Sequence, residues 1–310
     1  MSALESDIRP VGQRTVKKKY FSFRGYGMLL PAFLLMLVFS YYPPIMAIIF
    51  SFSHWDGFNP PAFNGLQNYI SVLTDHLFWI SMFHLGVWSF FKLILEISIP
   101  LIVAVVIYHL KSERARYIYR VLFVIPMVVP MIVQLMVWSF IYSPQIGMLD
   151  TFLKDIGLGM LTQNWLGAPH IALYSLVFVG FPFVIPFNLL IFYAGLQNIP
   201  DSVFEASRLD GVSRIRRFFT IEVPLVLGQI KLLMILTIIG LLQNIALPLV
   251  LTNGGPGYST YIPGLYMYFT AFTNGELGLG MAIAMILFII VLALTLLQVK
   301  FIKPSTEFEA

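Results

Sequence analysis

The chain has 310 residues, of which 58% are hydrophobic and only 11% are charged, and it contains no cysteine. A soluble domain carries about 25% charged residues, so this composition excludes an ordinary soluble protein and indicates a protein surrounded by lipid. The lack of cysteine excludes disulfides and thiolate metal sites. A net charge of +4 fits cytoplasmic loops rich in lysine and arginine better than a nucleic-acid partner.

Six apolar stretches follow one another along the chain, each long enough for the roughly 20 residues that a transmembrane helix needs. They cover residues 28–50, 78–108, 121–142, 171–195, 225–251 and 280–299. We therefore predict an all-α, polytopic membrane protein with six transmembrane helices. A basic segment, 1–27, precedes the transmembrane domain at 28–303, and a tail at 304–310 follows it. Pro182, Pro186 and Pro248 are expected to kink their helices.

Basic residues alternate between the two sides of these stretches. They gather in the N-terminal segment, after the second stretch, after the fourth and at the C-terminal end, whereas the other three loops hold only Lys154. The positive-inside rule then predicts that both termini are cytoplasmic. The outer loops are 53–76, 143–170 and 252–279. We expect a short amphipathic helix at 148–156 and a turn at the glycine-rich sequence 253–257.

The longest cytoplasmic loop, 199–224, has the pattern of a helix, a turn and a second helix. Ser202 and Glu205 have capping-box spacing, Gly211 can end the first helix, and Ser213 can cap the second. The small residues Ala206 and Ser207 would let a partner protein approach closely. The alternative is that Glu205 only caps the helix and the arginines of this loop only fix topology.

Few polar residues interrupt the apolar stretches. Lys92 and Glu96 lie four apart, on one helix face, as a structural ion pair or as a proton relay. Asn188 and Gln243 can hold helices together by interhelical hydrogen bonds. The histidines show no metal-ligand spacing, and no nucleophile lies beside a base, so neither a metal site nor an enzyme is predicted.

At the 199–224 loop the sequence resembles the permeases of binding-protein-dependent ABC importers. Their cytoplasmic signature is matched by Glu205-Ala206-Ser207, Gly211 and the Ile-x-x-Pro that ends at Pro224; Ser207 replaces the usual alanine. The sequence 251–257, followed by Ser259-Thr260, is similar to the turn after the fifth span in the carbohydrate branch, of the maltose and glycerol-phosphate type. The resemblance extends from about residue 26 to 303.

The resemblance implies a type I ABC importer permease in a bacterial or archaeal cytoplasmic membrane. Its partners would be a second, homologous permease, two copies of a cytoplasmic ATPase and an extracytoplasmic solute-binding protein. The ATPase would bind ATP and Mg, and no cofactor is expected in this chain, which lacks a Gly-x-x-x-x-Gly-Lys-Ser/Thr loop. The substrate would be a sugar. A phosphorylated polyol such as glycerol phosphate, or a proton-coupled transporter using Lys92 and Glu96, are the alternatives.

The resemblance also implies two sets of functional residues. The ATPase-coupling residues would be Glu205, Ala206, Ser207, Asp210 and Gly211. The substrate path would be lined by Phe183, Phe187, Asn188, Thr237, Gln243 and Asn244.

Overall fold

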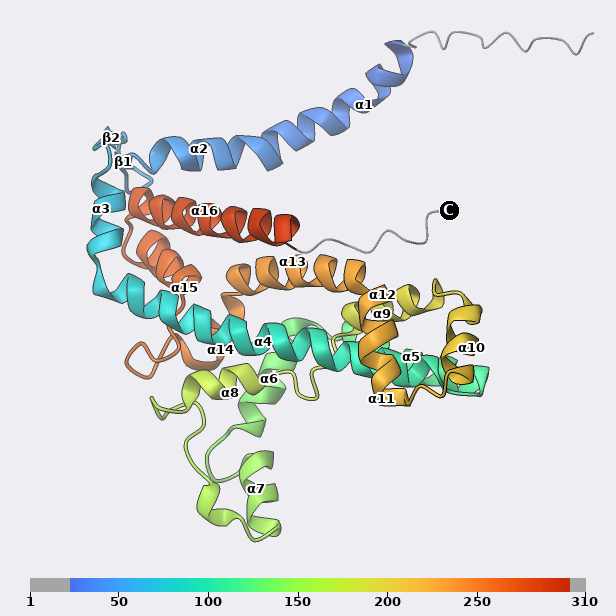
Figure 1. Ribbon diagram of the computed structural model, residues 1–310. Helices are drawn as coiled ribbons and strands as arrows, with labels where there is room; N and C mark the ends of the chain where they lie inside the picture. The colour runs from blue at the N-terminus through green and yellow to red at the C-terminus, as the bar shows by residue number, and fades with distance from the viewer. Residues whose placement is uncertain (1–22, 302–310) are drawn as a thin grey trace, which may run out of the picture. The chain divides into compact units, whose positions relative to one another are not determined.

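The computed structural model describes residues 23–301, and it divides the chain into two compact units, Met1–Met46 and Ala47–Ala310 (Figure 1). Most of the predicted basic segment and all of the predicted tail lie outside the described residues. The α-helices are α1 (Phe23–Met36), α2 (Tyr42–Phe50), α3 (Gln67–Thr74), α4 (His76–Tyr108), α5 (Glu113–Val124), α6 (Met131–Ile141), α7 (Met148–Asp155), α8 (Ala172–Phe178), α9 (Pro186–Gln197), α10 (Asp201–Leu209), α11 (Arg214–Arg217), α12 (Val223–Leu225), α13 (Leu227–Gln243), α14 (Ala246–Thr252), α15 (Pro263–Tyr268) and α16 (Leu277–Phe301).

Short irregular elements complete the described chain. The π-helical turns are η1 (Leu37–Tyr41), η4 (Phe218–Glu222) and η5 (Phe269–Thr273), and the 3-10 turns are η2 (Ile125–Val128) and η3 (Gly159–Leu161). Two strands, β1 (Ser53–His54) and β2 (Ala62–Phe63), pair antiparallel. The predicted all-α class is confirmed, as is the short amphipathic helix, which is α7.

Only three of the six predicted spans are continuous helices. The described part of the chain has three helices long and apolar enough to cross a membrane, at Gly27–Phe50, His76–Tyr108 and Leu277–Lys300. Two further pairs of helices are bent, by 93° between Glu113–Val128 and Met131–Ile141 and by 71° between Arg214–Leu225 and Leu227–Gln243. Pro130 explains the first bend, because proline forces the preceding residue out of the helical region.

The predicted fourth span is broken more deeply than a kink. Helices α8 and α9 are separated by residues 179–185, which we call the break segment. Gly180 (φ +94°) and Phe183 (φ +62°) adopt left-handed backbone conformations there, and neither Pro182 nor Pro186 has an amide hydrogen to donate. A non-helical segment inside a bilayer requires other protein groups to satisfy its free backbone atoms. Pro248, by contrast, lies within helix α14.

Helix α4 connects two hydrophobic cores in the larger unit. Its first half, with Phe78 and Trp88, packs into one core with residues of α8, α14, α15 and α16. Its second half, with Ala104, joins a second core with residues of α9 and α13, and this core also holds Phe204 of α10. Because α10 belongs to the predicted docking loop, that loop is anchored in the same core as the inner half of α4.

The third predicted outer loop is more ordered than its sequence indicated. The turn at its start is confirmed, with left-handed conformations at Asn253 and Gly254. The residues after it form α15 and η5, and Ile262 and Leu265 are almost fully buried. Buried tyrosines, among them Tyr266, join them in the core around α4. Short helices of this kind carry too few periodic positions to stand out from a loop in the sequence.

Gly278, at the start of α16, allows a close backbone contact. Its amide donates to the carbonyl of Trp55 at 2.9 Å, and a Cβ atom at this position would lie 2.0 Å from the carbonyl oxygen of Ser53. We expect Gly278→Ala to lower the melting temperature of the purified protein, at a cost of about 1–3 kcal/mol for the forced displacement. Gly240→Ala is the control, because its Cβ would meet nothing within 4 Å. Equal melting temperatures for both variants would contradict this packing.

Candidate functional site

The 199–224 loop folds as a helix, a tight turn and a second helix, as predicted. Helix α10 ends in a Schellman motif: the amide of Gly211 donates to Arg208 O at 3.1 Å, and the amide of Val212 donates to Ser207 O at 3.1 Å. Gly211 has φ +66°, which confirms its predicted role as the helix stop. The side chain of Ser213 accepts a bond from the amide of Arg216 at 3.4 Å, which confirms it as the cap of α11.

The predicted capping box of α10 does not form. The N-cap residue is Pro200, which makes no side-chain cap, and the helix begins at Asp201. Ser202 therefore lies within the first turn of the helix and not at its N-cap position. Glu205 is left exposed, so capping does not account for it.

The two sides of α10 differ sharply. Glu205, Ala206, Leu209, Asp210 and Gly211 are exposed, and together we call them the docking face. Leu209 is 88% exposed, and Ile215 and Phe219 of the same loop are 76% and 65% exposed, so this loop carries several exposed apolar side chains. Leu209 was not among the predicted coupling residues, although its position four residues after Glu205 places both on one helix face.

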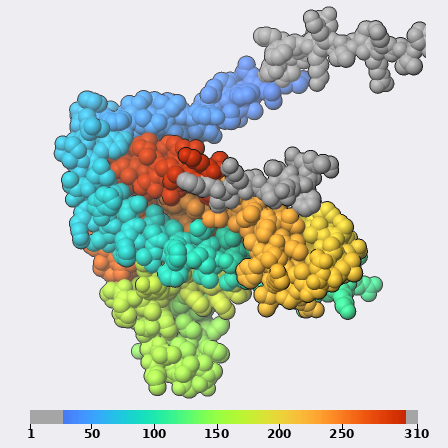
Figure 2. Space-filling view, viewed as in Figure 1, coloured from blue at the N-terminus to red at the C-terminus, as the bar shows by residue number. Residues whose placement is uncertain are grey.

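Ser207 faces the protein's own core and not a partner, contrary to what its small size suggested. The sequence suggested that a partner approaches closely at this small residue, but its side chain is 3% exposed and its hydroxyl donates to the carbonyl of Phe204 at 2.7 Å. Phe204 and Ser207 form the inner face of α10, because residues three apart lie on the same side of a helix. The small side chain of Ser207 thus fits α10 against its own protein. Figure 2 shows the α10–α11 surface, in yellow and orange, at one end of the larger unit.

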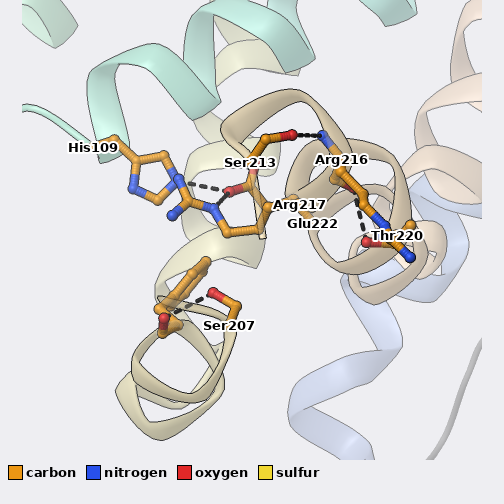
Figure 3. Close-up of polar contacts among 8 residues, drawn as sticks. His109, Ser207, Ser213, Arg216, Arg217, Thr220 and Glu222 are labelled. Atoms are coloured by element: carbon orange, nitrogen blue, oxygen red, sulfur yellow. Dashed lines mark hydrogen bonds and ion pairs between the residues drawn. The ribbon is translucent and has the colours of Figure 1, made fainter. Parts of the chain in front are cut away.

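Three ionisable residues meet behind the docking face, and we call them the clasp: His109 at the end of α4, Arg217 of α11 and Glu222 of η4 (Figure 3). Glu222 Oε1 lies 2.7 Å from His109 Nε2 and accepts from Arg217 Nε at 2.9 Å. Glu222 is 1% exposed and Arg217 is 9% exposed. The sequence could not reveal the clasp, because His109 and Glu222 are 113 residues apart.

The left-handed turn at Gly211 gives a direct test of the docking loop. We expect Gly211→Asp to keep the protein in the membrane but to lose most of the uptake that the resemblance implies, because a left-handed conformation costs a non-glycine residue about 1–2 kcal/mol and the turn would shift. Gly275→Asp is the matched control, since Gly275 (φ +74°) is equally left-handed, with open space around it, and lies far along the chain in the loop before α16. Uptake assays in membrane vesicles compare them; equal uptake by both variants would rule out a special role for this turn.

The break segment is held by a buried lysine from α4. Lys92 Nζ donates to the carbonyl of Val179 at 2.5 Å and lies 3.4 Å from a carboxylate oxygen of Glu96. It also lies 5.4 Å from the ring centre of Phe183. Lys92 is only 5% exposed. Its ammonium group therefore satisfies a free carbonyl at the end of α8, while Glu96 balances its charge.

The predicted substrate-path residues occupy two places. Phe183 is 4% exposed in the break segment, Phe187 is 44% exposed on α9, and the side chain of Asn188 donates to the backbone carbonyl of Glu96 at 2.7 Å. Asn188 thus makes an interhelical hydrogen bond. The second group is Thr237, Gln243 and Asn244: Thr237 is half-buried on α13, Gln243 is exposed at its end, and Asn244 Oδ1 accepts from Leu247 N at 3.4 Å.

These features define a class: a helical membrane protein with interrupted spans and a surface helix, α10, that has one buried and one exposed side. Residues 96–304 match the family described as binding-protein-dependent transport system inner membrane component. The chain belongs to this family, so it is a transport component of the inner membrane. Membership in this family excludes the alternative function, a proton-coupled transporter that uses Lys92 and Glu96.

Similar proteins cover nearly the whole chain. The trehalose/maltose transport system permease protein MalF of Thermococcus litoralis is 34% identical, over 92% of this chain and 96% of its own. The probable ABC transporter permease protein YurN of Bacillus subtilis is 33% identical, over 91% and 97%. The sn-glycerol-3-phosphate transport system permease protein UgpA of Shigella flexneri is 26% identical, over 92% and 95%.

A solved structure shares the fold. A chain of a bacterial alginate ABC transporter, solved in complex with an alginate pentasaccharide-bound periplasmic protein, superposes with a TM-score of 0.77. The match covers 89% of this chain and 92% of that chain, at 18% sequence identity. The predicted fold of an ABC importer permease is therefore confirmed.

Proposed function

We propose that this chain is the permease subunit of an importer for an uncharged sugar, and that its docking face binds a separate cytoplasmic ATPase. The observation that carries this proposal is α10 itself, a short helix fixed by a Schellman motif and presenting Glu205 and the 88% exposed Leu209 away from its own core. ATP and Mg would be bound by the ATPase, and closure of the ATPase on ATP would move α10 and α11 as one body.

Some of the coupling residues would contact the ATPase, and the others would hold α10 in its position. Glu205, Ala206, Leu209 and Asp210 would touch the ATPase, with Glu205 paired to a basic side chain. Gly211 would shape the turn, and Ser207 would keep α10 seated on its own core, since its hydroxyl is bonded to Phe204 O. An exposed leucine beside a carboxylate supports a docking surface, because interfaces combine apolar anchors with charged partners.

The other partners follow from the family's dependence on a binding protein. A second, homologous permease would supply the other half of the path, two ATPase copies would drive the pair, and an extracytoplasmic solute-binding protein would deliver the sugar. Of the predicted substrate-path residues, Phe187, Thr237, Gln243 and Asn244 would form this chain's wall of the path. Phe183 and Asn188 are buried and would support that wall from within the chain, Asn188 through its bond to Glu96 O. Aromatic rings and amides suit a sugar, which is bound by stacking and by hydrogen bonds.

A phosphorylated polyol is the second candidate substrate, suggested by the similarity to the sn-glycerol-3-phosphate permease. An anionic substrate would call for an available positive charge near the break segment. The lysine there, Lys92, is buried and already engaged by Glu96 and by the carbonyl of Val179. This arrangement favours an uncharged substrate, as does the higher identity to the trehalose/maltose permease.

Reconstitution tests the proposed function. The chain, its partner permease and the ATPase would be placed in proteoliposomes, and ATP hydrolysis measured with the binding protein, empty and loaded. We expect the binding protein loaded with an uncharged sugar to stimulate ATP hydrolysis and to allow ATP-dependent uptake. Stimulation only by glycerol phosphate would replace the sugar with the second candidate, and no stimulation by any loaded binding protein would contradict the proposal.

A further inference from the structure

The clasp contains more hydrogen-bonding contacts than it can satisfy at one time. His109 Nε2 lies 2.7 Å from Glu222 Oε1 and 3.0 Å from Arg217 Nη2. A ring nitrogen carries either a hydrogen or a lone pair. With a hydrogen it donates to Glu222 but faces the N–H of Arg217; with a lone pair it accepts from Arg217 but faces the oxygen of Glu222. Only one of the two contacts can be a hydrogen bond in either state.

The other oxygen of Glu222 points to a second arrangement. Glu222 Oε2 is buried and has no hydrogen-bond partner in the described part of the chain. Arginine commonly binds a carboxylate through two nitrogens at once, one to each oxygen. A modest rotation of Arg217 toward Oε2 would satisfy this oxygen and leave His109 Nε2 free to donate to Oε1. The clasp therefore has two hydrogen-bonding patterns, with His109 bonded to Arg217 in one and to Glu222 in the other, and α4 is tied to the docking loop in both.

Phe204 connects the clasp to helix α10 of the docking loop. Phe204, on the inner face of α10, lies 5.5 Å from the ring of His109 and 5.8 Å from the guanidinium of Arg217. A pocket of about 240 Å³ is lined by both His109 and Phe204, so the end of α4 and the inner face of α10 meet beside the clasp. A displacement of α10 thus acts directly on the groups that form the clasp.

We propose that His109, Arg217 and Glu222 form a link that passes movement of the docking loop to the inner end of α4 and that holds in either hydrogen-bonding pattern. This inference rests on the proposed ATPase docking. Through the bonded histidine, movement of α10 and α11 is passed to α4, the helix that joins the two hydrophobic cores. The three residues are positioning residues for coupling, and none of them belongs to the docking face.

The cleanest variant is His109→Phe, which keeps an aromatic ring beside Phe204 and leaves the Arg217–Glu222 pair intact. In the reconstituted complex we expect the amount of substrate imported per ATP hydrolysed to fall at least about fivefold, with a melting temperature close to that of the unmodified complex. His76→Phe, the same change at the exposed opposite end of α4, is the control. A normal import ratio for His109→Phe would overturn the proposal.

A second pair of variants separates coupling from stability. Glu222→Gln leaves Arg217 with a buried, unbalanced charge and should lower the melting temperature, whereas the double variant Arg217→Gln/Glu222→Gln should recover much of it. We expect both to remain poorly coupled, and Arg216→Gln, which changes the exposed neighbouring arginine, to behave normally. Normal coupling in the double variant would overturn the link.

Glu205→Lys separates the failure of the clasp proposal from that of ATPase docking. If Glu205→Lys lowers the amount of substrate imported per ATP while the clasp variants do not, ATPase docking stands and the clasp proposal fails. If Glu205→Lys also has a normal import ratio, both proposals fail.

Discussion

Reversing one charge on the docking face, in Glu205→Lys, should abolish substrate uptake while leaving the protein folded in the membrane. The side chain is exposed, so its replacement disturbs no packing within this chain. If Glu205 pairs with a basic residue of the ATPase, the substituted lysine would face a like charge, at a cost of about 2–5 kcal/mol in docking free energy. That cost corresponds to roughly a 30-fold or greater loss of affinity.

Two measurements check this prediction: ATP-dependent uptake into proteoliposomes and co-purification of the ATPase with the permease. Glu113→Lys is the matched control, because Glu113 is a carboxylate with a 92% exposed side chain on α5, outside the docking face. We expect uptake and co-purification to be normal for Glu113→Lys and lost for Glu205→Lys. Normal uptake by Glu205→Lys would remove Glu205 from the docking face.

The second large effect concerns Lys92. Lys92→Met would leave Glu96 as an unbalanced carboxylate in the bilayer and the carbonyl of Val179 without its donor. Breaking one partner of a buried ion pair costs about 3–5 kcal/mol, so we expect a markedly lower melting temperature and poor recovery of the protein from membranes. The break segment would also lose its anchor, which should weaken apparent substrate affinity in the uptake assay.

Two further variants show whether charge balance explains the loss. The double variant Lys92→Met/Glu96→Gln removes both charges and should be more stable than Lys92→Met alone. Lys231→Met is the external control: Lys231 donates to a carbonyl of α16 at 3.1 Å but lies in an exposed position, so its loss should matter little. Equal melting temperatures for the single and double variants at 92 and 96 would contradict an ion pair that stabilises the fold.

The sequence predicted the features that depend on local pattern. Six apolar stretches and the asymmetry of basic residues led to an all-α membrane protein, and Gly211 and Ser213 were correctly placed at the end of one helix and the start of the next. These succeeded because left-handed glycines and cap residues act within one turn of their own position. The break at 179–185 was underestimated as a kink, because prolines indicate an interruption but not its length.

The residues that the sequence misassigned or missed depend on contacts across the fold. Ser207 was expected to face a partner, yet the side of α10 that turns inward is set by packing of Phe204 into the core. Lys92 and Glu96 were recognised as a pair, but the carbonyl of Val179, 87 residues from Lys92, was not foreseeable. The clasp joins the end of α4 to η4 and has no local signature in the chain.

The docking of this chain on an ATPase is tested most directly with a single cysteine. The natural sequence has none, so Leu209→Cys places one unique thiol on the docking face, and Phe152→Cys places a control thiol on α7, where Phe152 is 57% exposed. Labelling by a water-soluble maleimide would be compared for the permease alone and for the assembled complex. We predict that the ATPase protects residue 209 and leaves residue 152 equally reactive. Equal labelling of residue 209 with and without the ATPase would contradict the proposed docking.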